Sequence, residues 1–359
     1  MGRVKHYRHS FYSGSQRLRQ VLTVLVAVAL LFGLGWLIGP HVIDFGTRTW
    51  YSLKNGTSQT QSAPAESASE AAPTPTPAPT PTPTPAPPKV DEGTWSIVSM
   101  SGIDTAEKAA ATAAELAADG TRYAVFTLKD EQGYIYYPSK LETAAQSVAA
   151  TTIDPAAAAR VFKEAGLVPV AQLCAFQDPK APYADRTMGI HYRDTEYFWL
   201  DANSEAGGKP WLDPFAPGSA AFIDGLIGEV RSMGFEHILL TGVQFPFTDG
   251  SNANYQTGGI TKTAQLAKLI DHWQTEAEEA GGMLWVEYTL NEAAGGQPVP
   301  LGGGEFAELG VENLVLRLGQ KDDPEALEEQ LTAARAAAAK GGAEHLVLRQ
   351  GSQAVFDKK

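Results

Sequence analysis

The chain contains two carboxylates and two arginines whose positions could bring them together. Asp130 and Glu287 each lie near the end of a short apolar run, and so do Arg317 and Arg349. Two carboxylates can divide the acid and base roles of a reaction when their surroundings push the two pKa values apart. Two alternatives stay open: Glu287 forms an ion pair with one of the arginines, because buried charges must be paired, and Asp130 caps the loop that follows it.

The apolar runs alternate with helical patterns from residue 95 onward. The predicted strands are 95–101, 123–130, 167–176, 237–246, 283–289, 313–319 and 345–351. The predicted helices are 105–119, 155–165, 219–233, 261–280, a short one near 304–309, and 324–340. Strict β-α alternation predicts an α/β fold, and its length favours a TIM-type (β/α) barrel over an open doubly wound sheet. Seven strands are one too few, so the barrel is incomplete or is completed by 353–357 or by 295–304.

Alternation along these strands predicts which side chains face the barrel lumen. In 283–289, Trp285 and Glu287 face inward, whereas Leu284, Val286 and Tyr288 face the helices. The same pattern turns Arg317 and Arg349 inward in the last two of these strands, and Gln172 in 167–176. These polar side chains should therefore meet near the C-terminal mouth, where barrel enzymes carry out their chemistry.

Several motifs resemble one known family. The segments LVPVAQLCAFQDP, WLDP at 211–214 and MGFEHILLTGVQFP, together with Lys129, Asp130, Gly133 and Tyr136, appear in the order seen in a family of glycoside-hydrolase-like domains of unknown function. The resemblance covers most of residues 95–351. It implies a TIM barrel distantly related to the α-amylase-like hydrolases and a carbohydrate as the ligand.

The chain departs from the family at three charged positions. Where the family has arginine, aspartate and arginine, this sequence has Gln172, Thr241 and Gln244. Glycoside hydrolysis needs two carboxyls, about 5 Å apart for retention and about 6.5–9.5 Å for inversion, and Thr241 cannot be one of them. The departures predict a site that still binds sugar but has lost or reduced catalysis. An active hydrolase that uses Glu287 and Asp130 is the alternative.

A loop of about forty residues, 177–218, is rich in aromatic side chains and has no clear secondary structure. Loops of this length are usually binding surfaces or lids, and its rings could stack on sugars or merely pack the loop onto the barrel. Asp178 and Asp213 each precede a proline, where aspartate often begins a turn. The predicted sugar-contacting residues are Gln172, Asp178, Trp199, Trp211, Asp213, Thr241, Gln244, Trp285, Arg317 and Arg349.

The N-terminal part differs in composition from the rest. Residues 1–20 carry five Lys or Arg and no acid, and the 19 residues from Val21 to Gly39 carry no charge. This pattern predicts a transmembrane helix with its N-terminus in the cytoplasm, although a cleaved secretory signal is an alternative. Residues 40–92 form a linker, in which nine prolines in 73–88 favour an extended polyproline II spacer, and 93–359 form the barrel domain.

Charge and composition limit the classes of partner that the protein can bind. Residues 93–359 hold 20 bases and 36 acids, so this domain repels phosphate backbones and nucleic acid is not expected as a partner. The sequence predicts no cofactor or metal, because His191 has no partner at ligand spacing and Cys174 is the one cysteine. The leading hypothesis is a membrane-anchored domain outside the cell that binds polysaccharide of the cell envelope or its surroundings. A scaffold that binds an unknown protein partner is the competing hypothesis.

Overall fold

The computed structural model describes residues 90, 92–247, 252–320, 323–351 and the backbone of 353–357. These residues belong to the second of two compact units, Thr80–Lys359. The basic tail, the segment from Val21 to Gly39 and the linker up to residue 89 lie outside the described residues. None of the described helices is both long enough and apolar enough to span a membrane.

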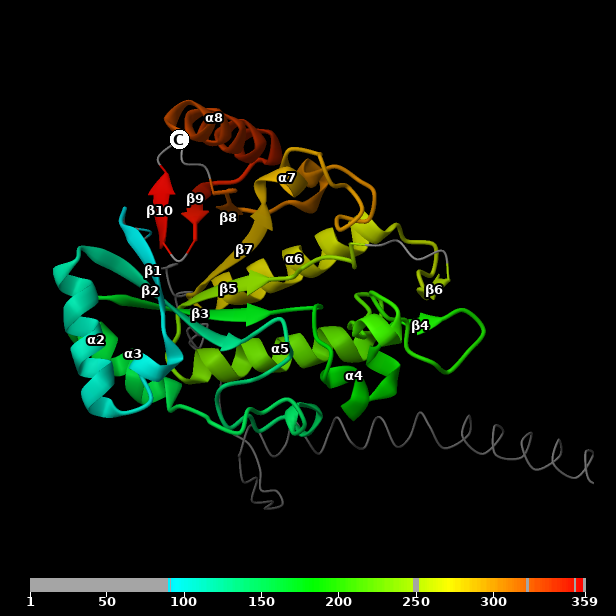
Figure 1. The fold of residues 1–359 in the computed structure, drawn as a ribbon, viewed down its shortest axis with the longest axis horizontal. Helices are drawn as coiled ribbons and strands as arrows, with labels where there is room; N and C mark the ends of the chain where they lie inside the picture. Colours follow the sequence, from blue (N-terminus) through cyan, green and yellow to red (C-terminus); the bar gives the residue numbers. More distant parts are fainter. Residues whose placement is uncertain (1–89, 91, 248–251, 321–322, 352, 358–359) are drawn as a thin grey trace, which may run out of the picture. The chain divides into compact units, whose positions relative to one another are not determined.

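Seven parallel strands form the core of the domain (Figure 1). They are β1 (Thr94–Val98), β2 (Thr121–Lys129), β3 (Val168–Cys174), β5 (His237–Thr241), β7 (Met283–Thr289), β8 (Asn313–Arg317) and β9 (His345–Gln350). The ring closes through β10 (Gln353–Asp357), which pairs antiparallel with both β9 and β1. The predicted α/β fold is confirmed as a TIM-like barrel that is incomplete, since seven strands rather than eight run parallel. The segment 353–357 supplies the missing edge, as one of the sequence alternatives proposed.

The helices cover the outside of the strands, as the alternation predicted (Figure 1). The longer ones are α2 (Ala106–Ala118), α3 (Pro155–Glu164), α5 (Pro217–Ser232), α6 (Lys262–Glu279) and α8 (Pro324–Gly341). Short helical turns are α4 (Ala181–Ala184), α7 (Leu290–Ala293) and five 3₁₀ segments, at Met100–Gly102, Glu142–Ala144, Arg186–Met188, Ser204–Ala206 and Phe306–Leu309. Four long helices begin after a Thr or Asp whose side chain accepts a hydrogen bond from a backbone N–H of the first turn. These capping residues are Thr105, Asp154, Thr261 and Asp323. Such residues mark helix starts in a sequence, which explains why these starts could be predicted.

Two apolar cores lie on the two sides of the strands. The lumen is filled by large side chains that include Trp95, Tyr123 and Trp285, all almost fully buried. Leu284 and Val286, the residues on either side of Trp285 in sequence, belong to the other core, between strands and helices. The predicted alternation in β7 is therefore confirmed, and the lumen is a packed interior.

Candidate functional site

Glu287 lies among arginines at the C-terminal mouth of the barrel. Its side chain is 6% exposed, and one carboxylate oxygen, Oε2, accepts a hydrogen bond from the Arg349 guanidinium. The Nη1 atom of Arg317 lies 3.9 Å from the other oxygen, Oε1. Glu287 pairs in register with Val315 of β8. Arg317 lies two residues after Val315, one inward layer higher, and pairs in register with Arg349 of β9. The ion-pair alternative for Glu287 is confirmed; a catalytic role for it stays a prediction.

Thr241 adjoins Glu287 in the barrel. Leu240 pairs with Val286 across β5 and β7, so the next residue on each strand, Thr241 and Glu287, lie side by side. Thr241 is two residues after Leu239 on β5, so its side chain points to the same side as that of Leu239, which packs in the lumen. Among inward-facing positions of the strands whose side chains are described, Glu287 is the one carboxylate. This layer of the barrel therefore offers one acid, already paired with arginine, where two-carboxyl chemistry needs a second.

The lumen below this layer leaves almost no room. The cavity beside Gln172, Arg349 and Trp95 measures about 10 Å³, which is room for about one water molecule and not for a sugar ring. Gln172 Oε1 and Trp95 Nε1 are buried, and neither has a hydrogen-bond partner in the described part of the chain. Trp285 is also fully buried, and its indole N–H donates to His237 Nδ1 at 3.2 Å. A saccharide would thus meet this region from above the mouth rather than inside the lumen.

His237 must stay neutral to accept that hydrogen bond. Burial lowers the pKa of His237 to about 4, because the lumen disfavours the charged imidazolium. Gln244 follows β5 and is also largely buried, next to Val243, whose carbonyl accepts the Tyr288 hydroxyl. His237 and Gln244 thus pack around the strand ends. Sugar contact stays a prediction for Gln172, Thr241, Gln244, Trp285, Arg317 and Arg349.

Asp130 organises the loop that follows β2. Its Oδ1 accepts the backbone N–H groups of Gln132 and Tyr134, and its Oδ2 accepts the Tyr136 hydroxyl at 2.6 Å. The hydrogen bond to this carboxylate raises the pKa of Tyr136 to about 12. The loop-capping alternative for Asp130 is therefore confirmed, and its catalytic role stays a prediction.

The neighbouring residue, Lys129, forms an ion pair that the sequence reasoning missed. Its side chain is fully buried, with Nζ 3.0 Å from Asp178 Oδ2 and hydrogen-bonded to the Cys174 carbonyl. Asp178 Oδ1 accepts the N–H groups of Lys180 and Ala181, as expected for an aspartate that begins a turn. A lysine within an otherwise apolar strand was the available signal, because a buried cation requires an acid nearby.

Several aromatic side chains of residues 177–218 are buried. Trp199 and Trp211 pack with Ile190 in a small core of their own, and the Trp211 indole N–H donates to Asp201 Oδ2 at 3.0 Å. Trp199 is 4% and Trp211 2% exposed, so neither ring offers a face to a sugar in this structure. The packing alternative accounts for both rings, and sugar stacking on them stays an untested prediction.

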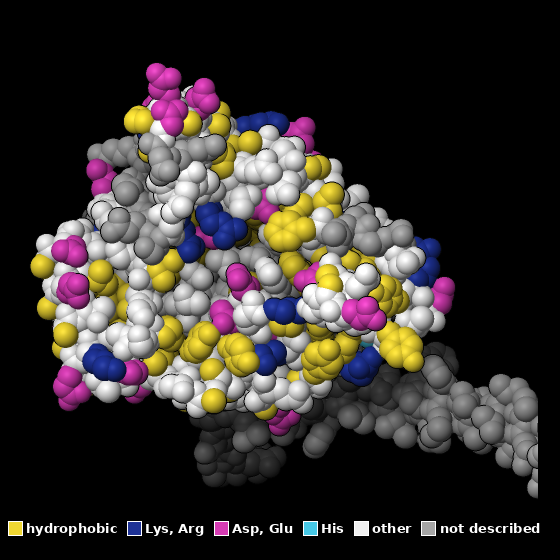
Figure 2. All heavy atoms as spheres, in the orientation of Figure 1, with side chains coloured by type: hydrophobic (Ala, Val, Ile, Leu, Met, Phe, Trp, Pro, Cys, Tyr) yellow, Lys and Arg dark blue, Asp and Glu magenta, His cyan; other side chains and the backbone are white. Residues whose placement is uncertain are grey.

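Other rings of the same loop do reach the surface. Tyr183 is 55% and Tyr197 76% exposed. Figure 2 shows hydrophobic side chains at the surface on its lower right, where α4 and the short strand β4 (His191–Tyr192) lie in Figure 1. With Tyr192 they border a hollow of about 590 Å³, which we call the tyrosine groove. Its polar lining comes from Arg186, Asn203, Ser204 and Glu205.

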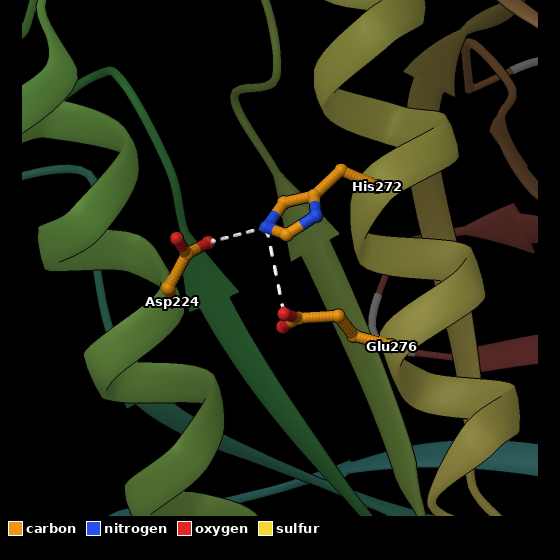
Figure 3. A group of neighbouring side chains, drawn as sticks. All are labelled: Asp224, His272 and Glu276. Atoms are coloured by element: carbon orange, nitrogen blue, oxygen red, sulfur yellow. Dashed lines mark ion pairs between the residues drawn. The ribbon is translucent and has the colours of Figure 1, made fainter. Parts of the chain in front are cut away.

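One group of side chains has a composition that could hold a metal ion. Asp224 on α5 faces His272 and Glu276 on α6, and their nearest ligand atoms lie within 4.8 Å of one another (Figure 3). His272 Nε2 is 3.5 Å from Asp224 Oδ1 and 3.7 Å from Glu276 Oε1, and Asp224 Oδ1 also accepts the Trp273 indole N–H. These contacts lie on a partly exposed helix surface, where neighbouring acidic groups are common without a bound ion. We assign no metal to them.

Comparisons with known proteins identify one family in sequence and several similar solved structures. The sequence profile of the family described as "Putative glycosyl hydrolase domain" (DUF4015) matches residues 99–284. Among curated proteins, none matches this chain in sequence.

Among solved structures, the cycloalternan-forming enzyme of Listeria monocytogenes has a TM-score of 0.50 and 11% identity, over 74% of this chain and 26% of that one. The GH20 exo-β-N-acetylglucosaminidase of Vibrio harveyi has a TM-score of 0.48 and 12% identity, over 72% and 40%. A hypothetical protein from Ruminiclostridium thermocellum has a TM-score of 0.46 and 17% identity, over 53% and 95%. The chain thus spans less than half the length of these two enzymes, and at such identities the likeness concerns the fold alone.

Proposed function

Since the chain belongs to the family described as "Putative glycosyl hydrolase domain", we propose that its barrel domain binds a polysaccharide of the cell envelope or its surroundings without hydrolysing it. The family supplies the class of ligand, and the residues at the mouth of the barrel supply the argument against hydrolysis. The proposal holds for the barrel domain in residues 93–359.

The observation that carries the proposal is the pairing of Glu287. Its carboxylate is neutralised by Arg349 and approached by Arg317, and the neighbouring inward position is Thr241. An oxocarbenium-like transition state needs a carboxylate nucleophile or base together with a proton donor. Arg349 and Arg317 thus approach both oxygens of this carboxylate, and Thr241 beside it supplies no second carboxyl. Asp130, the other candidate, already accepts three hydrogen bonds from its own loop.

The tyrosine groove is the surface that suits a sugar chain best. Tyr183 and Tyr197 are exposed aromatic side chains, and Asn203, Ser204 and Glu205 supply hydrogen-bonding groups beside them. An aromatic ring buries the apolar C–H face of a pyranose, while the polar groups at its edge replace the water lost by the hydroxyls. The groove is open to solvent, as a long polymer requires.

We place this domain outside the cell on the strength of the N-terminal sequence. The uncharged run from Val21 to Gly39 follows a basic segment, and the proline-rich stretch at 73–88 would hold the barrel domain away from the bilayer. A reporter fused after residue 359 tests this topology. Activity of a reporter that functions only outside the cytoplasm supports the proposal, and activity of a cytoplasm-specific one contradicts it.

The binding proposal is tested with the full chain on an array of envelope and extracellular polysaccharides. We expect binding of at least one glycan, weakened roughly 2–10-fold by Tyr197→Ala, because aromatic contacts contribute about 0.5–1.5 kcal/mol. Tyr134→Ala is the matched control, since Tyr134 is also exposed but does not line the groove. Absence of binding to any glycan, with a protein captured instead through the groove, would favour the protein scaffold.

The loss of hydrolysis is tested separately on every glycan that binds. We expect no cleavage products from the natural chain and none from the Glu287→Gln variant. Thr241→Asp combined with Gln244→Arg restores the charges of the family at two positions and should give detectable cleavage if the remaining mouth is intact. Hydrolysis by the natural chain that Glu287→Gln abolishes would show the active hydrolase instead.

A further inference from the structure

A second hollow lies on the other side of β4 (His191–Tyr192) from the tyrosine groove. It measures about 510 Å³ and is bordered by residues 187–196, by 213–218 and by 254–256. Successive residues of a strand point to opposite sides. Accordingly, His191 lines this hollow and Tyr192 lines the tyrosine groove. We call the second recess the acidic hollow, for the reason that follows.

Acidic side chains predominate in the lining of the acidic hollow, although Lys262 acts on Asp213 from α6. Asp194, Glu196 and Asp213 line it, whereas His191 is the one basic side chain and no Lys or Arg is present among the described lining residues. Neutral hydrogen-bonding groups come from Asn254 and from other polar side chains of the same three segments. The composition suits a ligand that carries hydroxyl groups and a positive charge, and it repels an anionic one.

Asp213 is the buried acid of the hollow. It is 6% exposed, and its Oδ1 accepts the backbone N–H of Phe215 at 2.9 Å. Oδ2 is not one of the fully buried oxygens, so it is open to the hollow that Asp213 lines. A largely buried carboxylate with one oxygen open to a hollow is poorly solvated, so a cation that enters the hollow stabilises it.

We propose that the acidic hollow binds a sugar unit with a free, protonated amino group, and that the Asp213 carboxylate forms the ion pair with this amine. The inference rests on the proposed glycan-binding function and names the class of sugar. An N-acetylated unit presents a neutral amide to Asp213, and a plain hexose presents a hydroxyl. Neither compensates the buried charge, so the hollow should prefer the free amine over both.

The ion pair should depend on pH in a defined direction. Burial raises the pKa of Asp213 to about 6, against the opposing effect of Lys262 on the neighbouring helix α6. His191, Asp194 and Glu196 face the same hollow, and protonation of any of them also makes the hollow less negative. Loss of the Asp213 charge should therefore lower the affinity about tenfold as the pH decreases from 7 to 5. This fall is partly offset because the sugar amine gains protons over the same range.

The test compares two oligosaccharides that differ only in acetylation. The full chain is titrated calorimetrically with a tetramer of β-1,4-linked glucosamine and with the fully N-acetylated tetramer, at pH 7 and at pH 5. We expect the glucosamine tetramer to bind at least tenfold more tightly at pH 7, and this preference to shrink at pH 5. Asp213→Asn should remove the preference, since the amide keeps the acceptor for the Phe215 N–H but carries no charge.

The control variant removes an acid from the other recess. Glu205→Gln changes a carboxylate that lines the tyrosine groove and should leave the preference for the amine unchanged. A thermal melt of each variant identifies loss of folding, and Glu196→Gln, at the same hollow, should weaken the preference even if Asp213→Asn fails to fold.

The outcomes separate this inference from the proposed function. Equal affinity for both tetramers, or a preference that survives Asp213→Asn and Glu196→Gln, overturns the amino-sugar site. If glycan binding is then still weakened by Tyr197→Ala, the proposed function stands without it. If no glycan of any kind binds, both fail.

Discussion

The lumen of the barrel and the loop of residues 177–218 use similar residue types but leave very different amounts of space. Both contain tryptophans, acids and polar side chains, yet the lumen keeps a cavity of about 10 Å³ whereas the loop borders hollows of about 510 and 590 Å³. Strands repeat every two residues, so their inward side chains interdigitate in layers. An irregular loop has no such repeat and leaves recesses between its turns. The comparison teaches that the loop leaves open space at the surface, whereas the packed lumen leaves almost none.

The largest expected effect concerns the ion pair that joins the two regions. Lys129 ends β2 and Asp178 begins the loop, and both are fully buried. Lys129→Met should destabilise the fold by about 3–5 kcal/mol, because it leaves an unpaired buried carboxylate. Urea unfolding measures the change. Lys163→Met, at the exposed Lys163–Glu236 pair, is the control and should cost less than about 1 kcal/mol; equal effects would mean that the barrel does not anchor the loop.

The second prediction distinguishes packed from exposed rings within the loop. Trp211→Ala should lower the free energy of unfolding by about 3–5 kcal/mol, because Trp211 is buried against Ile190 and Trp199. Tyr197→Ala should change it by less than about 0.5 kcal/mol, because the ring is exposed. A Trp211→Ala variant that unfolds like the natural chain but loses glycan binding would make Trp211 a sugar-stacking residue after all.

The third prediction compares how two titrating groups, one in each region, change the stability of the fold with pH. His237 in the lumen has its pKa lowered from 6.5 to about 4, so the stability it contributes is present above pH 6.5 and is lost as the pH falls through 4. Asp213 in the loop has its pKa raised from 3.8 to about 6, so its contribution is present below pH 3.8 and is lost as the pH rises through 6. Each is on the order of 3 kcal/mol, and between pH 4 and pH 6 they oppose each other.

Single substitutions should reveal the two opposing terms in denaturation measured from pH 7 to pH 4. The Asp213→Asn variant should lose stability more steeply than the natural chain does as the pH falls. His237→Asn, which retains an acceptor for the Trp285 N–H, should make the stability rise instead. Parallel pH profiles for all three proteins would contradict the burial assigned to both groups.

The smallest effect concerns the loop that lies over Asp178. Gly133 has a φ of 75°, and a Cβ there would come within 2.4 Å of Asp178 Oδ1. Gly133→Ala should therefore cost about 1–3 kcal/mol. Gly120→Ala, with a φ of 78° but nothing within 4 Å of its Cβ, measures the strain of the backbone alone. Both are measured by thermal unfolding, and equal costs would mean that Asp178 has room to move.

Much of the fold and part of the candidate site could be predicted from the sequence. The strand at 283–289 was predicted with its exact bounds, and the inward position of Trp285 and Glu287 followed from alternation, a local property of the backbone. The alternatives given for Glu287 and Asp130, ion pairing and loop capping, describe what the structure contains. The sequence could not show which oxygen of Asp130 accepts from Tyr136, because that depends on the path of the loop.

What the sequence by itself determined was whatever depends on near neighbours along the chain: the alternating strands, the Thr and Asp residues at helix starts, and the absence of a carboxylate at Thr241. Only the tertiary structure decided which aromatic rings of the loop are buried, that Lys129 meets Asp178, that β10 closes the ring antiparallel, and that three acids surround one hollow. The physical reason is range. Backbone periodicity and capping act over a few residues, whereas burial and ion pairing depend on segments that only the folded chain brings together.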